Sequence, residues 1–359
     1  MEKVRVNLGP GYDICIGEGI LSGLGPALSE CGLSPKTLLV SNSSVDRLYG
    51  DKVSRSLEKA GFAVAREVIP DGEEHKNLQT ASRLFDAAAG ARLDRHSAVV
   101  ALGGGVTGDM AGFLSATYLR GLSFVQVPTT LLAQVDSSIG GKVAVNHPRG
   151  KNLIGAFHQP LLVWSDLETL QTLPYRELLT GLAENIKHGI IADTSLFLYI
   201  RDNLAGILAA APEPMAEMVA RSCRVKVAVV EQDELEQGLR AVLNLGHTFG
   251  HAVESVTGYC RYRHGEGVAL GISAASRLAC GLGILPEADL KEIISLLERA
   301  GLPVSGTGLD PGELYRALAY DKKVVAGEIR FVLPVKIGKA EVFQGLNQAD
   351  ILQALGTIC

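Results

Sequence analysis

Residues 97–109, which read SAVVALGGGVTGD, decide the first part of the fold. The stretch begins with an apolar run of strand length and leads directly into three glycines. Gly103, Gly105 and Gly108 have the spacing GxGxxG, and a helical pattern follows over residues 108–119. Glycine lets the backbone approach a pyrophosphate, and the N-terminus of a helix offers free N–H groups. The stretch therefore predicts a nucleotide-binding turn, although a tight strand-to-helix connection would have the same spacing.

Two features differ from an ordinary Rossmann fingerprint. The glycine turn does not follow the first strand of the chain. No acidic residue follows it at about 20 positions, where one would hold a ribose. Asp109 comes immediately instead, where its carboxylate could bond a ribose or cap the helix.

Two further polar turns follow predicted strands. Residues 71–76 (DGEEHK) come after a strand at 62–69, and residues 128–130 (PTT) come after a strand at 123–127. Ligands of parallel sheets bind beyond the carboxyl ends of the strands. Three polar turns at such ends favour a dinucleotide site over three unrelated connections.

Strand and helix patterns alternate through the first half of the chain, which predicts a mostly parallel sheet with helices on both faces. After Pro174 helical patterns dominate. They cover residues 177–191, 214–231, 246–256, 267–282 and 288–300, and one strand pattern follows at 329–334. We therefore predict an α/β domain with a Rossmann-like, mostly parallel sheet over residues 1–174, and an all-α, metal-binding domain over residues 175–359.

Composition narrows the class of protein. The chain has 359 residues, of which 47% are hydrophobic and 20% charged, so it is long enough for two globular domains. The net charge of -5 without a basic stripe argues against a nucleic-acid partner. The N-terminus has no apolar signal region, and no apolar run reaches the length of about 18 residues that spans a membrane. Six scattered cysteines without a CxxC pair indicate reduced thiols and a cytoplasmic location.

The second half contains a candidate metal site. His247 and His251 are four residues apart, so they share one face of a predicted helix. Glu184 lies on another predicted helix, and His264 lies in what reads as a turn, RYRHGEG. One carboxylate and two imidazoles match a catalytic zinc ion with one position open. His251 or His188 could equally be the third ligand, and histidines that cluster by chance would have the same spacing.

Basic and amide side chains accompany these residues. Lys187 follows Glu184 by three positions and shares its helix face. A single lysine is usually a solvated surface charge, but the whole set favours a substrate with more than one anionic group. The other members are Arg120, Lys142, Lys151, Asn152, Lys226, Arg240, Asn244, Lys322 and Lys323.

Six long motifs occur in order along the chain. They are LGGGVTGDMAGF (102–113), QVPTTLLAQVDSSIGGKVAVNHPRGKNLIGAFHQP (126–160), GLAENIKHGI (181–190), LNLGHTFGHAVE (243–254), RHGEGVALG (263–271) and DKKVVAGEIRFVLP (321–334). With the length and the domain order, they resemble the 3-dehydroquinate synthase family. Six motifs in register are far more specific than any one of them.

The resemblance implies a role for each matching residue. Glu184, His247 and His264 would bind zinc, with cobalt a possible substitute, and His251 would face the substrate. NAD would contact Asp71, Gly72, Glu73, Glu74, His75, Lys76, Gly105, Val106, Thr107, Gly108, Asp109, Thr129, Thr130, Lys142, Lys151, Thr169, Leu170, Gln171 and Thr172. The substrate pocket would contain Asp136, Lys142, Asn152, Lys187, Lys226, Arg240, Asn244, His251 and one lysine of Lys322 and Lys323, for which we take Lys323. Arg120 would reach across the interface of a homodimer.

The resemblance also implies the reaction. A carbon–oxygen lyase of the shikimate pathway would convert 3-deoxy-D-arabino-heptulosonate 7-phosphate to 3-dehydroquinate and phosphate, on the way to aromatic amino acids. The steps would be a transient oxidation by NAD, phosphate elimination, re-reduction and an intramolecular aldol closure. The alternatives are another sugar-phosphate cyclase, such as a 2-deoxy-scyllo-inosose synthase, a polyol dehydrogenase of the glycerol dehydrogenase type, and a zinc-stabilised NAD sensor without activity. A substrate carboxylate that requires Arg240 and Lys226 would distinguish the first alternative.

The chain departs from the family pattern at four positions. Asn185 stands where an aliphatic residue is usual, and Thr107 replaces a common isoleucine. His158 and His188 occupy positions that are often tyrosine. We expect His188 to lie either behind the metal ligands or at the surface.

Overall fold

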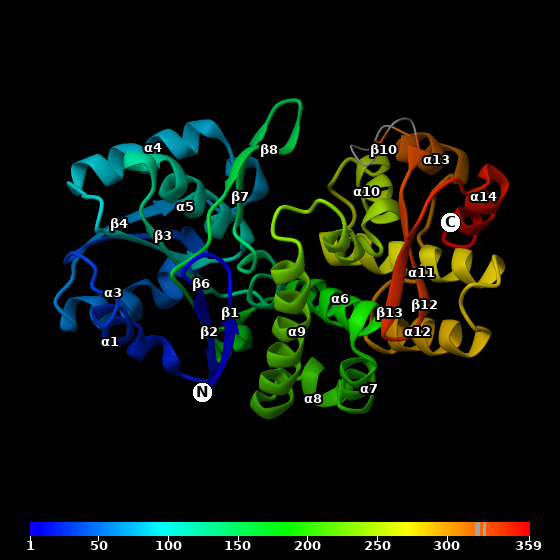
Figure 1. Cartoon of the computed structure of the whole chain (residues 1–359), viewed down its shortest axis with the longest axis horizontal. Coiled ribbons are helices and arrows are strands. Elements are labelled where there is room, and N and C mark those ends of the chain that lie inside the picture. Colours follow the sequence, from blue (N-terminus) through cyan, green and yellow to red (C-terminus); the bar gives the residue numbers. More distant parts are fainter. Residues whose placement is uncertain (320–323, 326–327) are drawn as a thin grey trace. The chain divides into compact units, whose positions relative to one another are not determined.

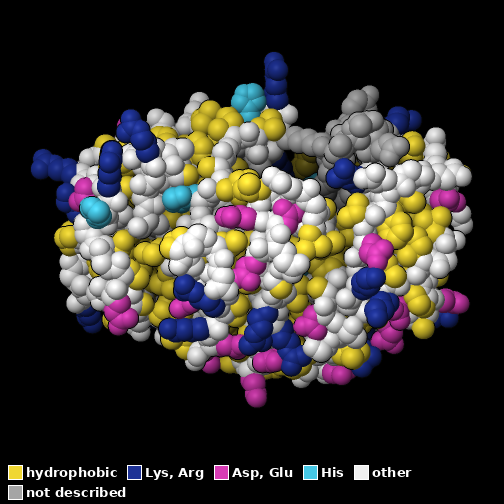
Figure 2. Space-filling view, in the orientation of Figure 1, with side chains coloured by type: hydrophobic (Ala, Val, Ile, Leu, Met, Phe, Trp, Pro, Cys, Tyr) yellow, Lys and Arg dark blue, Asp and Glu magenta, His cyan; other side chains and the backbone are white. Residues whose placement is uncertain are grey.

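The computed structural model describes residues 1–319, 324–325 and 328–359 (Figure 1). These residues form two units, Met1–Leu173 and Pro174–Cys359, each with many internal contacts. Among the described residues, no helix combines the length and the apolar character needed to cross a membrane. On the face drawn in Figure 2, Lys and Arg side chains are interspersed with Asp and Glu.

A sheet of seven strands forms the centre of the first unit. In their order across the sheet, the strands are β1 (Glu2–Val6), β2 (Tyr12–Gly17), β9 (Leu162–Asp166), β6 (Ser123–Pro128), β5 (Ala98–Gly103), β3 (Lys36–Asn42) and β4 (Ala63–Ile69). Neighbouring strands are parallel, except that β1 is antiparallel to β2 at the edge. The predicted mostly parallel sheet is therefore confirmed.

Helices cover both faces of this sheet. Successive residues of a strand point to opposite faces, so each strand contributes side chains to two apolar cores. Leu38 belongs to one core with Leu84 and Met110, whereas Leu39 belongs to the other core with Leu57. The first core is supplied by α4 (Leu78–Gly90) and α5 (Gly105–Thr117), and the second by α1 (Leu24–Ser29) and α3 (Asp51–Lys59) (Figure 1).

The order of the strands reverses at β3. The chain passes from β3 to β4 on one side and returns to β5 on the other side. In a parallel sheet, such a reversal leaves a crevice beyond the carboxyl ends of the two strands, and ligands bind there. Gly103, the last residue of β5, and the glycines after it lie at this point of the sheet.

The hairpin of β7 (Lys142–His147) and β8 (Gly150–Phe157) was not predicted from the sequence. Val143 and Val145 of β7 pack into the core beside α4 and α5, and Asn146 pairs with Asn77 just before α4. Every residue of β8 is exposed or half-buried. A strand without a buried face has no need of alternating apolar and polar residues, so the pattern that indicates a strand is absent.

The second unit is mainly helical, as predicted. Its helices are α6 (Tyr175–Ala192), α7 (Thr194–Asp202), α8 (Leu204–Leu208), α9 (Pro212–Gln232), α10 (His247–Val256), α11 (His264–Gly281), α12 (Glu287–Arg299), α13 (Pro311–Ala319) and α14 (Gln348–Gly356). It is not purely helical, because β12 (Phe331–Lys336) pairs with β13 (Lys339–Phe343), and the short β10 (Val324–Val325) pairs with β11 (Glu328–Ile329). The strand predicted at 329–334 corresponds to β12.

Glycines bring α10 and α11 into close contact. A Cβ atom added at Gly271 would lie 1.8 Å from the carbonyl oxygen of Gly246, and one added at Gly250 would lie 2.7 Å from that of Gly267. Gly265 packs equally closely against Thr180 of α6. His264 is the first residue of α11, so the expectation that it lies in a turn is wrong. The glycines around it serve helix packing, although in the sequence they resemble turn residues.

Candidate functional site

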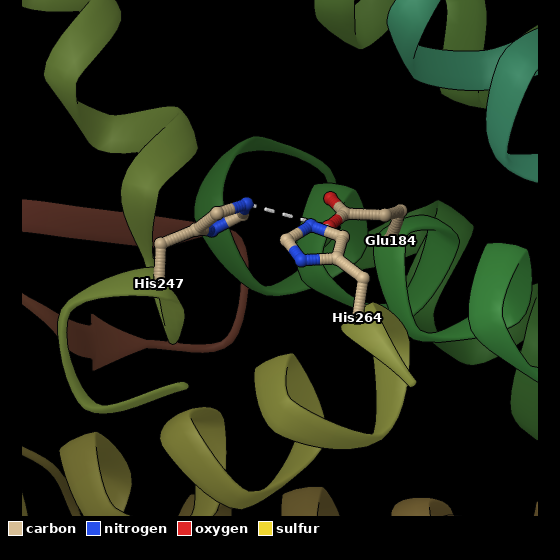
Figure 3. Close-up of side chains that lie close together, drawn as sticks. All are labelled: Glu184, His247 and His264. Carbon is tan, nitrogen blue, oxygen red and sulfur yellow. Dashed lines mark ion pairs between the residues drawn. The ribbon is translucent and has the colours of Figure 1, made fainter. Parts of the chain in front are cut away.

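Glu184, His247 and His264 come together inside the second unit, although they lie on three different helices (Figure 3). Glu184 Oε1 lies 3.6 Å from His247 Nε2 and 3.7 Å from His264 Nε2. One ligand atom from each of the three residues lies within 4.8 Å of the other two. Ligand atoms about 2.0–2.1 Å from a tetrahedral zinc ion would be ~3.4 Å apart. A small adjustment of these side chains would therefore enclose a zinc-sized ion.

The environment of Glu184 also fits a cation. Its side chain is completely buried, and apart from the ammonium group of Lys187 no described residue donates a hydrogen bond to its carboxylate oxygens. The ammonium group of Lys187 makes an ion pair with Oε2 from the next turn of α6. Burying a carboxylate is costly unless charges and hydrogen bonds satisfy both oxygens. A divalent ion beside Oε1 would supply the missing interaction.

The two imidazoles present the same nitrogen to Glu184. His247 Nδ1 lies 3.2 Å from the carbonyl oxygen of Leu245, and His264 Nδ1 lies 2.9 Å from Glu254 Oε1. Both oxygens are acceptors, so in the neutral ring each Nδ1 would carry the hydrogen, which leaves Nε2, the nitrogen nearer Glu184, free to bind a cation. Glu254 was not singled out from the sequence, although it is seven residues after His247 and therefore shares its face of α10.

His251 lies outside this group of ligand atoms, whereas one nitrogen of His188 also lies within 4.8 Å of a Glu184 carboxylate oxygen. The His251 ring lies 5.6 Å from the His247 ring and 6.2 Å from the His264 ring, centre to centre, and none of its nitrogens joins the three ligand atoms. His188 is fully buried, and its Nδ1 lies 2.5 Å from Ser222 Oγ on α9. Of the two positions expected for His188, the surface is excluded, and its burial beside α9 agrees with a place behind the ligands.

Three basic residues of the predicted substrate set are buried in the second unit. Lys187, Lys226 and Arg240 expose 5% or less of their surface, so they are not ordinary solvated charges. Arg240 Nη1 donates to the carbonyl oxygen of Glu234 at 2.6 Å. Asn244 Nδ2 lies 3.4 Å from Glu236 Oε1. Lys322 and Lys323 lie outside the described residues.

In the first unit, the glycine turn forms a narrow cradle at the N-terminus of α5. Cβ atoms added at Gly104 and Gly105 would each lie 3.1 Å from a side-chain atom, Thr130 Cγ2 and Ser137 Oγ respectively. Gly104 is the N-cap residue, and no side chain caps this helix. The helix begins three residues earlier than predicted, so Val106, Thr107 and Gly108 lie in its first turn. Such a bare helix N-terminus fits a pyrophosphate.

The turn after β4 reaches the same helix. Lys76 makes an ion pair with Asp109 of α5 and also donates to Asn152 Oδ1 at 2.6 Å. Asp109 therefore does not cap α5. Asn152 adopts a left-handed φ of 54°, and its N–H donates to Asn146 Oδ1 at 2.8 Å. Lys76 thus links one residue of the predicted NAD set to one residue of the predicted substrate set.

Asp71 begins this turn. Burial alone would raise its pKa, but hydrogen bonds from Ser44 and Asn42 outweigh that effect and hold the pKa below its ordinary value. The carboxylate therefore stays charged at neutral pH. Among the other residues of the turn, Glu73, Glu74 and His75 form a short 3₁₀ helix after Gly72.

Gln134 links the turns after β6 and β9, a role that was not predicted from the sequence. It is fully buried, and its Nε2 donates to the carbonyl oxygens of Pro128 and Asp166, each at 3.2 Å. The predicted NAD residues Thr129 and Thr130 follow β6, and Thr169, Leu170, Gln171 and Thr172 lie in the 3₁₀ helix that follows β9. Thr130 Oγ1 accepts from the N–H of Ala133 at 3.1 Å and so caps the next helical turn.

The remaining predicted residues of the first unit are more accessible. Lys142, Lys151 and Asn152 are exposed on the β7–β8 hairpin, and Asp136 is half-buried in the turn Ala133–Ser137. Arg120 is exposed and has a left-handed φ of 68°.

Comparison with known sequences decides the family. The sequence model for the N-terminal region of 3-dehydroquinate synthase matches residues 66–180, and the model for the C-terminal region matches residues 181–324. The chain belongs to the 3-dehydroquinate synthase family. It is 54% identical to the 3-dehydroquinate synthase of Pelotomaculum thermopropionicum, over 99% of this chain and 96% of that protein. It is 51% identical to the 3-dehydroquinate synthase of Desulforamulus reducens, over 99% of each.

Solved structures agree with this family assignment. A 2-deoxy-scyllo-inosose synthase complexed with carbaglucose-6-phosphate, NAD⁺ and Co²⁺ is 25% identical with a TM-score of 0.91, and the match covers 99% of each chain. The 2-epi-5-epi-valiolone synthase of Streptomyces hygroscopicus, with NAD⁺ and Zn²⁺ bound, is 30% identical with a TM-score of 0.89, over 99% of this chain and 98% of that one. A glycerol dehydrogenase of Schizosaccharomyces pombe is 16% identical with a TM-score of 0.71, which shows a shared fold.

The four departures from the 3-dehydroquinate synthase pattern are accommodated locally. Asn185 is fully buried and donates to the carbonyl oxygen of Gly181 at 2.9 Å within α6. His158 Nε2 lies 2.9 Å from the carbonyl oxygen of Leu122. Thr107 is buried against Gly103 in the glycine turn. His188 contacts Ser222, so each of the four side chains has a polar or packing partner.

Proposed function

We propose that the chain catalyses the conversion of 3-deoxy-D-arabino-heptulosonate 7-phosphate to 3-dehydroquinate and phosphate. The observation that carries the proposal is the grouping of Glu184, His247 and His264 in a unit that also buries Lys187, Lys226 and Arg240. A ligand set for a divalent cation and several buried cations suit a polyhydroxylated substrate with two anionic groups. The family assignment supports the same reaction.

The proposal includes two cofactors. Glu184, His247 and His264 would hold zinc, and the turns after β4, β5, β6 and β9 would hold NAD. When bound, NAD supplies a reversible hydride acceptor and zinc supplies a Lewis acid for the oxygen at C5 of the substrate. Related cyclases with NAD⁺ and Co²⁺ or Zn²⁺ bound support both assignments.

The buried cations would bind and orient the substrate. Arg240 is held by the Glu234 carbonyl before any substrate arrives, so little side-chain entropy is lost when it pairs with a carboxylate. Lys226 would pair with a second anionic group. Side chains fixed in this way also hold the reacting carbons in one geometry, which lowers the barrier to elimination and ring closure.

His251 would carry the proton of the C5 hydroxyl. Its ring lies beside the rings of both His247 and His264, so a substrate oxygen near the metal ligands would be within its reach. Histidine is the side chain best suited to exchange protons near neutral pH. No protein base is assigned to the C6 proton, which the departing phosphate could accept.

Three further assignments belong to the proposal, of which the first two rest on the resemblance to the family and the third on the scattered cysteines without a CxxC pair. The reaction would place the enzyme among the carbon–oxygen lyases, because phosphate leaves by elimination. The chain would form a homodimer in which Arg120 crosses the interface, and it would act in the cytoplasm.

Substrate choice tests the proposal. The purified protein, with NAD⁺ and zinc, should release phosphate from the heptulosonate 7-phosphate and yield a product with the mass of 3-dehydroquinate. Glucose 6-phosphate and glycerol should not be consumed. Turnover of glucose 6-phosphate instead would assign the chain to another class of sugar-phosphate cyclase, and oxidation of glycerol with accumulation of NADH would make it a polyol dehydrogenase.

A further inference from the structure

Glu254 contacts the side of His264 that faces away from Glu184. Its Oε1 lies 2.9 Å from His264 Nδ1, while Nε2 of the same ring lies 3.7 Å from Glu184 Oε1. The Glu254 side chain is only 8% exposed, so water does not compete strongly for the contact. Because a carboxylate accepts hydrogen bonds, this geometry requires the hydrogen of the neutral ring to sit on Nδ1.

The position of Glu254 on α10 makes this contact rigid. Glu254 lies on the same face of α10 as His247, so one helix supplies one of the three ligands and holds another. The close contact of α10 with α11 leaves little space between the carboxylate and Gly267. A Cβ atom added at Gly267 would lie 3.1 Å from Glu254 Oε1 and 3.3 Å from its Cγ.

We propose that Glu254 is a positioning residue that fixes His264 in the tautomer whose Nε2 binds the metal ion. The inference rests on the metal site of the proposed function. The other imidazole is fixed differently, because His247 Nδ1 faces the neutral carbonyl of Leu245. The charged partner of His264 also makes that ring a stronger electron donor to a cation. Loss of Glu254 should therefore weaken metal binding even though Glu254 does not touch the metal.

Metal affinity provides the first test. The zinc dissociation constant is measured by competition with a chromophoric chelator, without substrate or NAD. Glu254→Ala should weaken zinc binding about 10- to 100-fold, the usual effect of removing such a partner. Glu254→Gln keeps an oxygen acceptor but loses the charge, so its effect should be smaller.

A matched control separates this role from a general effect of charge. Glu177 makes an ion pair with Arg263, the residue before His264, at 3.3 Å and touches none of the three ligands. Glu177→Gln removes one negative charge from the same region, as Glu254→Gln does. Its zinc affinity should equal that of the unmodified protein. A loss equal to that of Glu254→Gln would attribute the effect to net charge and overturn the proposal.

The tautomer itself provides a second test that needs no metal. Long-range proton–nitrogen NMR spectra of the metal-free protein at pH 8 distinguish the two neutral tautomers, and a His264→Asn variant identifies the His264 signals. The Nδ1–H tautomer should dominate in the unmodified protein and in Glu254→Gln. It should lose its dominance in Glu254→Ala. Near-ultraviolet circular dichroism shows whether each variant is folded, and the zinc affinity of Glu254→Gln compared with that of Glu177→Gln decides the matter if the alanine variant is not.

Two outcomes would overturn the inference. They are a folded Glu254→Ala variant with unchanged zinc affinity, and one whose His264 keeps the Nδ1–H tautomer. Failure of the unmodified protein to bind zinc would refute the metal assignment in the proposed function. The tautomer in the metal-free protein would still decide the role of Glu254, so the two failures are distinguishable.

Discussion

Glu184 contacts both of the candidate histidine ligands and a predicted substrate-binding lysine. It lies in the stretch 178–191 of α6, every residue of which is buried, and polar side chains in such a stretch need specific partners. Glu184 has an ion pair with Lys187 on one side and two imidazole nitrogens on the other. Its single carboxylate would therefore serve both a cation and a substrate-binding lysine.

Replacing this carboxylate tests its role as a ligand. Glu184→Gln keeps the size of the side chain but removes its charge, so the metal site should no longer retain zinc after dialysis. Atomic absorption should find about one zinc ion per chain in the unmodified protein and almost none in the variant. A variant with a full complement of zinc would contradict the assignment.

Arg240 is the residue that best distinguishes a carboxylate substrate. It is 3% exposed and is oriented by the carbonyl of Glu234. Arg240→Ala should lower kcat/KM by roughly 30-fold or more, since a buried charge-assisted pair is worth about 2–5 kcal/mol. Steady-state kinetics measure the effect, with the exposed Arg299→Ala as the control. Equal kinetics of Arg240→Ala and the unmodified protein would remove Arg240 from the pocket.

At the scale of elements, the site depends on how closely α10 and α11 approach. His247 begins the first of these helices and His264 begins the second, so their separation follows from the packing of the two backbones. Gly246, Gly250, Gly267 and Gly271 form the contact. Glycine is required there because any side chain would push the helices, and with them the imidazoles, apart.

A methyl group in this contact should therefore be costly. Gly271→Ala places a Cβ 1.8 Å from the Gly246 carbonyl oxygen, and it should lower the free energy of unfolding by about 2–3 kcal/mol. Urea unfolding followed by circular dichroism measures the change. Gly281→Ala, at the other end of α11 where nothing lies within 4 Å, should be neutral or slightly stabilising. Equal stability of the two variants would show that the helices do not pack in this way.

Across the whole molecule, elements with a repeating apolar pattern could be predicted from the sequence, whereas contacts between distant segments could not. Buried strands such as β5 and long helices such as α6 have strong apolar patterns, and both were predicted close to their observed bounds. The β7–β8 hairpin was missed because its exposed strand has no alternation. His264 was assigned to a turn because the purpose of Gly265 and Gly267 is visible only in the packing of three helices.

The candidate site shows the same limit. The residue types and the helical spacing pointed to a metal site, but spacing alone left His188 and His251 open as third ligands. The resemblance to the family selected Glu184, His247 and His264, and the structure places ligand atoms of these three residues together. Glu254 and Gln134 were not found, because their roles depend on contacts between segments that are far apart in the sequence.

The proposed reaction is a redox-neutral, metal-dependent cyclisation, and the ratio of phosphate released to NAD⁺ supplied tests it directly. The protein is given excess 3-deoxy-D-arabino-heptulosonate 7-phosphate and a trace of NAD⁺, with and without a chelator. We predict many phosphates per NAD⁺, loss of the reaction with the chelator and recovery with added zinc. Release that stops at one phosphate per NAD⁺ would refute this reaction. So would release that continues unchanged after the chelator has removed the bound metal.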